Sequence, residues 1–293
     1  MAKDTKIESS TLSPSKTNFL SKLCWWTQHE DEDWSSNPND AWAKISSDQI
    51  VDTVVPISPQ TPPAPNMVRF VCMSDTHNTT DSLYHPVPDG DVLLHAGDFT
   101  FHGSLNEANK FNKWLGTLPH PHKVVIAGNH EVLLDQEACL FVKAADPLQV
   151  LTNATYLNED SVTLYGIKIY GAPWTPEYGK MAFNLQRGKE LRKKWSKIPK
   201  DTDILMTHGP PLGHGDLTWR KERVGCIDLL SATKNKVKPA YHVFGHIHEG
   251  YGMTTDGQTV FVNAATCNLN YNPVNPAIVF DMPLPDGFTK STP

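Results

Sequence analysis

Five short runs of this 293-residue chain place aspartate, asparagine or histidine directly after an apolar stretch, four of them beside a glycine. They are Ser74-Asp75-Thr76-His77, Gly97-Asp98, Gly128-Asn129-His130-Glu131, Thr207-His208-Gly209 and Gly245-His246-Ile247-His248. Carboxylate, imidazole and amide oxygen ligands together suit Mn²⁺ first, and Fe, Co²⁺ or Zn²⁺, better than Ca²⁺, which prefers oxygen ligands only. We expect the five runs to converge on two metal ions, with the Asp98 carboxylate bridging them.

The spacing within the runs supports convergence. Asp75 and His77 are two residues apart, as are His246 and His248, and residues i and i+2 of an extended chain point to the same side. The neighbouring glycines let the backbone approach the ligands closely or take a positive φ. Each residue alone also fits an ordinary role, such as a turn asparagine or a packed histidine, and only the ordered combination is specific.

The elements that must position these residues are short apolar runs that predict buried strands. They are Val68–Met73, Val92–Leu94, Val124–Ile126, Ile167–Tyr170, Ile204–Met206, Tyr241–Phe244, Val260–Val262 and Ala277–Phe280. Helices are predicted over Ser104–Leu115, which opens on a capping box, and over Leu185–Trp195 and Gly225–Ala232. Strands that alternate with helices indicate an α/β fold, in which sites form beyond the carboxyl ends of strands.

Residues 1–66 have a different composition, rich in Ser, Thr, Asp, Asn and Pro. We expect residues 1–20 to be loose and the segment from about 22 to 60, which carries four tryptophans, to pack on the domain or on a protein partner. The Pro-rich stretch Thr61–Asn66 reads as a stiff connector. The domain that carries the five runs is therefore expected over 67–293.

The charge and cysteine content exclude several classes of protein. A formal net charge of −6 without a marked Lys/Arg cluster argues against a nucleic-acid-binding surface. Five cysteines, an odd number without a C-x-x-C pair, indicate reduced thiols and a cytoplasmic location. No apolar run is long enough to span a membrane or to act as a signal core, so no membrane association is expected.

Four longer stretches resemble the metallophosphoesterase-domain-containing (MPPED) family of the calcineurin-like metallophosphoesterase superfamily. They are Arg69–His77, Asn184–Gly188, Met206–Leu212 and Phe244–Gly252. The resemblance runs from about Ser35 to the C-terminus. It implies two stacked central β-sheets flanked by helices, an α/β/β/α sandwich, and it implies a dinuclear metal centre.

The resemblance also implies a role for each residue. One metal would take Asp75, His77, Asp98 and His248, and the second would take Asp98, Asn129, His208 and His246. His130 matches the histidine that contacts the phosphate or protonates the leaving group. Separately from the resemblance, candidates for substrate contact are Asn129, His130, Asn184, Arg187, His214 and Tyr251, and a purely structural role fits each of the last four equally well.

One departure from the superfamily pattern narrows the expected class of substrate. Asp98 is followed by Phe99-Thr100 and lacks the Asp-Arg-Gly of the protein serine/threonine phosphatases, which disfavours a phosphoprotein and removes the acidic residue that would orient His130 there. Glu131 is adjacent in sequence, but adjacent side chains usually diverge, so that role is not assigned to it.

The expected chemistry depends on charge. Two divalent ions against Asp75 and Asp98 give a site of about +2, and ions about 3.5–4 Å apart lower the pKa of a bridging water so that hydroxide can attack in line. The resemblance implies small phosphodiesters, cyclic nucleotides among them, as substrates. The alternatives are a phosphomonoesterase or protein phosphatase, and a low-turnover nucleotide-binding scaffold of the same fold whose Pro-rich residues 56–65 serve a partner.

Overall fold

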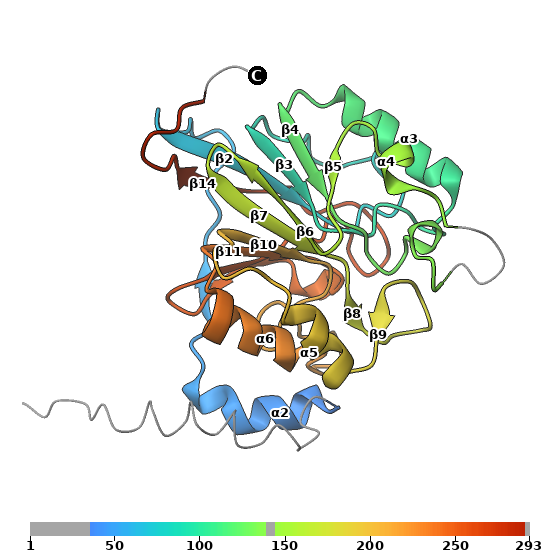
Figure 1. Ribbon diagram of the computed structural model, residues 1–293, viewed down its shortest axis with the longest axis vertical. Helices are drawn as coiled ribbons and strands as arrows, with labels where there is room; N and C mark the ends of the chain where they lie inside the picture. Colours follow the sequence, from blue (N-terminus) through green and yellow to red (C-terminus); the bar gives the residue numbers. More distant parts are fainter. Residues whose placement is uncertain (1–35, 139–143, 291–293) are drawn as a thin grey trace, which may run out of the picture. The chain divides into compact units, whose positions relative to one another are not determined.

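Two β-sheets pack face to face in this computed structural model, which describes residues 36–138 and 144–290 (Figure 1). The seven-stranded sheet has the order β1-β12-β13-β11-β10-β7-β6 and the five-stranded sheet the order β14-β2-β3-β4-β5. The strands of the first are Asp52–Val54, Gly252–Thr255, Val260–Asn263, Tyr241–Phe244, Ile204–Thr207, Ile167–Ala172 and Asp160–Leu164. Those of the second are Ile278–Pro283, Met67–Met73, Val92–His95, His122–Val125 and Thr155–Tyr156.

The centre of each sheet is parallel, and antiparallel strands join it toward the edges. Strands β2, β3, β4 and β5 run parallel in one sheet, and β7, β10, β11 and β13 run parallel in the other. Strands β14, β6, β12 and β1 pair antiparallel with their neighbours. A third, two-stranded sheet pairs β8 (Thr175–Pro176) with β9 (Asn184–Leu185). The carboxyl ends of the parallel strands therefore lie at one edge of each sheet.

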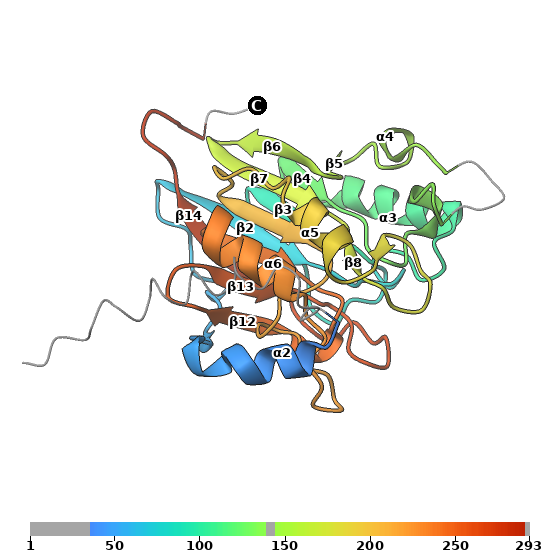
Figure 2. The ribbon, with the colours of Figure 1, turned by 60° about the horizontal axis from the view of Figure 1, so that its bottom comes forward.

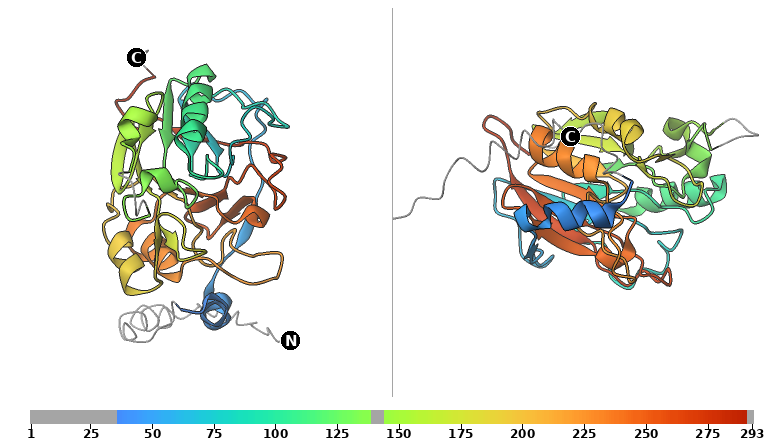
Figure 3. Two further views of the ribbon diagram at one scale, coloured as in Figure 1. Left: turned by 90° about the vertical axis from the view of Figure 1, so that its right-hand side faces the viewer. Right: turned by 90° about the horizontal axis from the view of Figure 1, so that it is seen from below.

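Successive side chains along each strand point alternately to the two faces of its sheet, and this separates the core between the sheets from the outer layers. Phe70 and Leu94 point into the core between the two sheets, whereas their neighbours Val71 and Leu93 point to the opposite face of the five-stranded sheet. Helices cover both outer faces (Figure 3): α3 (Leu105–Thr117) covers the five-stranded sheet, and α5 (Lys189–Trp195) and α6 (Ile227–Ser231) cover the seven-stranded sheet. The chain thus has the α/β/β/α sandwich that the resemblance implied.

The helices begin where their sequences provide caps. The hydroxyl of Ser104 accepts from the Glu107 amide and the Glu107 carboxylate accepts from the Ser104 amide, so the predicted capping box is present at the start of α3. Helix α5 begins after Gly188, at a φ of 87°, and so starts later than predicted, because Leu185 lies in β9. Helix α6 continues into a π-helical turn over Ala232–Val237.

The remaining helical segments lie before the first strand or between successive strands. They are α2 (Pro38–Ile45), α4 (Pro147–Val150) and the 3₁₀ turns Ser46–Asp48, Val132–Leu134 and His248–Gly250. No helix within residues 36–138 and 144–290 is long and apolar enough to cross a membrane.

Residues 36–66 belong to the same structural unit as the two sheets. Strand β1 forms the edge of the seven-stranded sheet, and α2 (Figure 2) is tied to the loop after β10 by the side chain of Asn39, which accepts from the Arg223 amide at 2.8 Å. The Arg223 guanidinium lies 4.4 Å from the centre of the Trp42 ring. Trp25, Trp26 and Trp34, and the loose segment expected over residues 1–20, lie outside the described residues. The division of the chain at residue 66 stays a prediction.

Substitution of Phe111 by alanine tests the outer layer next to the five runs. Phe111 is 2% exposed and stacks on Phe99, the residue after Asp98, with ring centres 4.4 Å apart. The cavity left by Phe111→Ala should lower the free energy of unfolding by about 3–5 kcal/mol, measured by urea denaturation. Lys113→Ala, at a position of the same helix outside the core, should stay within about 0.5 kcal/mol of the parent. Equal stability of the two variants would contradict this packing role.

Candidate metal centre

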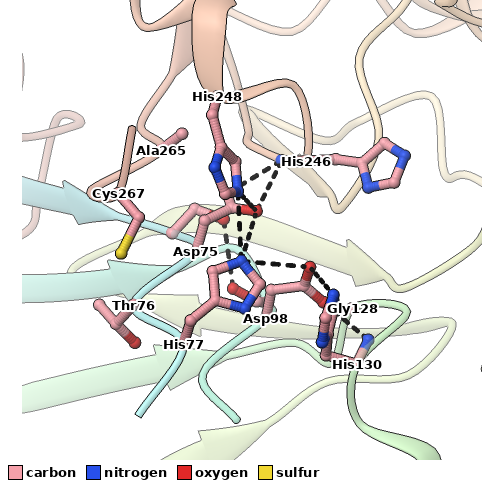
Figure 4. A network of polar contacts seen from close by, with 12 residues as sticks. Asp75, Thr76, His77, Asp98, Gly128, His130, His246, His248, Ala265 and Cys267 are labelled. Carbon is pink, nitrogen blue, oxygen red and sulfur yellow. Dashed lines mark hydrogen bonds and ion pairs between the residues drawn. The ribbon is translucent and has the colours of Figure 1, made fainter. Parts of the chain in front are cut away.

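The five runs lie beyond the carboxyl ends of five parallel strands. Asp75 and His77 follow β2, Asp98 follows β3, and Asn129 and His130 follow β4. His208 follows β10 of the other sheet, and His246 and His248 follow β11. Figure 4 shows the side chains of Asp75, His77, Asp98 and His248 directed toward one another. Three groups of acidic and histidine side chains there have ligand atoms within 4.8 Å of one another.

Asp98 lies at the middle of the cluster. Its Oδ2 is 3.2 Å from His208 Nε2, 3.8 Å from His77 Nε2 and 3.9 Å from His130 Nε2. Its Oδ1 accepts a hydrogen bond of 2.9 Å from the His130 amide. One carboxylate oxygen thus faces histidines that follow strands of both sheets.

Asp75, His77 and His248 form one half of the cluster. Asp75 Oδ1 is 3.4 Å from His248 Nε2 and 3.9 Å from His77 Nε2, and the two Nε2 atoms are 3.2 Å apart. The Asp75 carboxylate also accepts from the His246 amide at 2.9 and 3.0 Å. A carboxylate and two imidazole nitrogens directed at one point form a donor set that suits a divalent cation.

Asn129, His208 and His246 form the other half together with Asp98. Asn129 Oδ1 is 3.0 Å from His208 Nε2, and the rings of His208 and His246 have centres 5.0 Å apart. Asp98, His208 and His246 form one of the three groups that could hold a metal ion. The structure therefore brings together all seven residues that the sequence singled out as ligands.

Backbone carbonyls orient three of these histidines. The Nδ1 atoms of His77, His208 and His248 lie 3.2, 2.8 and 2.9 Å from the carbonyl oxygens of Thr100, Ala96 and Asn268. Because a carbonyl oxygen can only accept, each Nδ1 carries the proton and donates it, and the Nε2 atom is left to face the cluster. This arrangement fixes the tautomer and the ring direction that a metal ligand needs.

The electrostatics of the cluster favour added positive charge. Burial alone would raise the pKa of Asp98, but the charge and hydrogen bond of His208 hold that pKa well below its usual range. Burial opposes protonation of His208, yet the charge and hydrogen bond of Asp98, together with the charge of Asp75 and the Ala96 carbonyl, outweigh it and raise the pKa of His208 to about 9. Burial lowers the pKa of His77 and of His246 to about 4, so both imidazoles are neutral at pH 7. A divalent cation can take the place of the protons that the buried carboxylates attract.

The backbone of the cluster is held in an unusual conformation. Asp75, His77, Asp98 and His246 have φ values of 52°, 40°, 54° and 67°, in the left-handed region that residues other than glycine rarely adopt. Each such residue costs about 1–3 kcal/mol and persists only where the surroundings enforce it. A Cβ on Gly245 would lie 1.9 Å from Asp75 Oδ2, so only glycine lets the backbone pass there.

Glu131 is a positioning residue to which the sequence alone assigned no role. Its buried carboxylate accepts from the amides of Asp98 and Thr100, each at 2.8 Å, and from the Gly128 amide at 2.6 Å. It also accepts from the Thr100 hydroxyl at 2.8 Å, and burial together with the charge of Asp98 raises the pKa of Glu131 to about 7. Glu131 thus ties the Asp98 loop to the Asn129 loop. An acid directly after the Gly-Asn-His run was the available signal.

His130 is oriented by a backbone group. Its Nδ1 donates to the Phe101 carbonyl over 2.6 Å, which directs Nε2 toward Asp98 Oδ2 at 3.9 Å. The side chain is 14% exposed, so it faces the cluster and remains open to an incoming molecule. The sequence offered no acidic residue to orient His130, and in the structure the Phe101 carbonyl orients this ring instead.

Four of the expected substrate contacts have other roles in this structure. Asn184 donates to the Thr175 hydroxyl, Arg187 to the carbonyls of Val224 and Gly225, Tyr251 to the Pro276 carbonyl, and His214 stacks on Phe261. The polar groups of Asn184, Arg187 and Tyr251 thus hold loops in place, and the ring of His214 packs on a core phenylalanine. That these four residues also touch substrate stays a prediction, whereas Asn129 and His130 lie in the cluster.

The chain is similar in sequence to a family of known proteins. A model of the calcineurin-like phosphoesterase family matches residues 68–250. The chain is 46% identical to metallophosphoesterase domain-containing protein 1 of Homo sapiens over 280 residues, covering 87% of this chain and 85% of the human one. It is 44% identical to a UPF0046 protein of Caenorhabditis elegans, covering 87% and 96%. A crystal structure that is 15% identical has a TM-score of 0.51 and covers 75% of this chain and 100% of its own, which supports the fold.

Substitution of Gly245 by alanine tests the close approach of the backbone to Asp75. The added methyl group would also lie 2.2 Å from the Ser74 hydroxyl, so the Asp75 carboxylate must move. We expect about 10–100-fold weaker binding of Mn²⁺ in the half that contains Asp75, measured by calorimetric titration. Gly116→Ala, in α3 where the nearest atoms belong to the Asn153 side chain, should bind Mn²⁺ as the parent does. Parent-like Mn²⁺ affinity in Gly245→Ala would contradict the assignment of Asp75.

Proposed function

Since the chain belongs to the calcineurin-like phosphoesterase family and, within it, to the metallophosphoesterase-domain-containing family, we propose that it hydrolyses small phosphodiesters, cyclic nucleotides among them. Membership makes the protein a metal-dependent phosphoester hydrolase with two metal ions. The observation that carries the proposal is the convergence of Asp, His and Asn side chains from five strand ends, with the Nε2 atoms of three histidines directed inward.

The proposed ligand sets correspond to the two halves of the cluster. One ion would be held by Asp75, His77, Asp98 and His248. The other would be held by Asp98, Asn129, His208 and His246. Mixed nitrogen and oxygen ligands favour Mn²⁺ among the ions considered. Asp98 belongs to both sets, in keeping with the position of its Oδ2 atom between His77 and His208.

Two divalent ions at this centre would lower the pKa of a bound water and neutralise charge on the phosphoryl group. The residues of the chain supply the rest of the chemistry. Asp75 and Asp98 attract the cations, and Glu131 fixes the loops that carry Asp98 and Asn129. His130, held by the Phe101 carbonyl, would bind a phosphoryl oxygen or protonate the leaving oxygen through Nε2.

The loop after Asp98 supports the preference for a diester. Residues 99–103 include no arginine that could bind the second charge of a phosphomonoester. Phe99 is fully buried and Thr100 is bound to Glu131, so neither side chain is free to bind that charge. A cytoplasmic location and a protein partner for the N-terminal segment stay predictions.

Hydrolysis of bis(p-nitrophenyl) phosphate tests the proposal. With Mn²⁺ the protein should hydrolyse this diester faster than p-nitrophenyl phosphate, as measured by absorbance of the released phenolate. Dialysis against EDTA should abolish the activity, and Mn²⁺ should restore it better than Zn²⁺ or Mg²⁺. Undiminished activity after dialysis in excess EDTA would contradict the metal centre, and a faster reaction with the monoester would contradict the diester preference.

The role of His130 is tested with two leaving groups. General-acid help contributes about 10²–10⁴-fold, so His130→Ala should lower kcat by about that factor for an alkyl ester. The loss should be smaller for a p-nitrophenyl ester, whose leaving group departs without a proton. Metal content, measured by mass spectrometry, should not change, because His130 lies outside both proposed ligand sets. Equal losses for both esters would count against the acid role.

A further inference from the structure

Three aromatic side chains border the metal centre and have no part in the chemistry described so far. Phe101 lies in the loop after β3, Tyr178 in the loop between β8 and β9, and Tyr271 in the loop between β13 and β14. Tyr178 is 70% exposed and Tyr271 40% exposed, so both rings can contact an incoming molecule. Such rings offer flat apolar faces close to a site that is otherwise lined by charged and polar groups.

Tyr271 stands edge-on over one half of the cluster. Its ring centre is 4.8 Å from that of His77 and 5.6 Å from that of His248, with planes 84° and 86° apart. Its φ of 58° lies in the left-handed region, which a bulky residue rarely adopts. Backbone strain of this kind occurs where surrounding structure enforces it, often at sites of ligand contact.

Phe101 completes a wall with Tyr271. The two ring centres are 4.9 Å apart with planes at 70°, and the Phe101 ring lies 5.9 Å from that of His130. The backbone carbonyl of Phe101 accepts from His130 Nδ1. The wall therefore stands beside the residue proposed to protonate the leaving group.

The Asn268 carbonyl holds the wall and the metal centre together. This oxygen accepts from the Tyr271 amide at 2.9 Å and also lies 2.9 Å from His248 Nδ1. The Asn268 side chain accepts from the amides of Asn270 and Asn272 at 2.9 and 3.1 Å. The turn that carries Tyr271 is thus fixed to a proposed metal ligand, so the position of the ring relative to the ions is set by the fold.

We infer that Phe101 and Tyr271 form a subsite for a flat aromatic group, an aryl ring or a nucleobase, on the leaving-group side of the bound phosphoester. The inference rests on the proposed function, because it places the phosphoryl group at the metal centre. Stacking on aromatic side chains is the usual means of binding such groups without selecting one base. The Tyr178 ring lies 6.4 Å from that of His246, in the other half of the cluster. Tyr178 is therefore not part of this subsite and would face a different part of the substrate.

Binding of two phosphonates to the Mn²⁺-loaded protein tests the subsite without catalysis. Methylphosphonate and phenylphosphonate present the same anion to the metals, and their C–P bonds are not hydrolysed. The parent should bind phenylphosphonate about 5- to 100-fold more tightly by calorimetric titration, the range that stacking on aromatic side chains provides. Tyr271→Asn removes the ring while tolerating the positive φ, and it should abolish this preference and leave methylphosphonate affinity within about twofold.

Four further variants, with Tyr178→Leu expected to keep the preference, test which rings are responsible. Tyr271→Phe keeps the ring and should keep the preference, Phe101→Leu should reduce it, and Tyr84→Leu, at an exposed aromatic residue outside the wall, should not change it. The inference is overturned if the parent shows no preference, if Tyr271→Asn retains it, or if Tyr178→Leu abolishes it instead. In each of these cases methylphosphonate still binds and the proposed function stands. Failure of methylphosphonate to bind the Mn²⁺-loaded protein would overturn the proposed function together with the subsite.

Discussion

Two buried carboxylates set the main constraint on this structure. Asp75 and Asp98 are 0% and 2% exposed, and within residues 36–138 and 144–290 their ion-pair partners are all histidines. Two carboxylates in an apolar interior are costly unless positive charge compensates them. Protons on His208 and His248 provide part of that charge, since burial opposes protonation but the carboxylates raise the pKa of these histidines to about 9 and about 8. Divalent cations compensate the charge more fully, and metal binding is thereby coupled to the stability of the fold.

The second requirement is a scaffold that can hold unfavourable backbone. Four of the proposed ligands lie at positive φ, and their combined cost is of the order of several kcal/mol. The two sheets meet this cost because their parallel strands are buried on both faces, between the inter-sheet core and the outer helices. Glu131 adds a local tie, since one carboxylate fixes the amides of Asp98, Thr100 and Gly128. A rigid frame beneath and a hydrogen-bonded loop above are what place side chains to the accuracy that metal ligation demands.

The sequence predicted the parts of this structure that repeat a simple pattern. The eight apolar runs correspond to strands β2, β3, β4, β7, β10, β11, β13 and β14, because buried strands, above all parallel ones, are continuous apolar stretches. Strands such as β6 and β12 lie toward the sheet edges, are partly exposed and have mixed composition, which gave no apolar run to detect. Glu131 was missed because its role depends on amides from another strand end. The sequence left the roles of Arg187 and His214 open, because proximity to a motif does not tell whether a side chain points into a site or into a loop. In the structure Arg187 donates to loop carbonyls and His214 stacks on Phe261.

The carbonyl groups that orient the histidines link the functions of separate loops. The Thr100 carbonyl faces His77 while the amide and hydroxyl of the same residue are bound by Glu131, so the His77 ring and the Asp98 loop depend on a common residue. The Asn268 carbonyl likewise serves both His248 and the turn of Tyr271. A displacement of either loop would therefore alter a metal ligand and its neighbouring group together. In the neutral form, which is the form that binds a metal, each of these histidines has only one ring proton to donate. Loss of the carbonyl would then also free the tautomer, and the imidazole could turn its protonated nitrogen toward the cluster. The loop carbonyls thus determine where the Nε2 lone pairs of these histidines point, and the capacity of the cluster to bind cations depends on the loops as well as on the ligands.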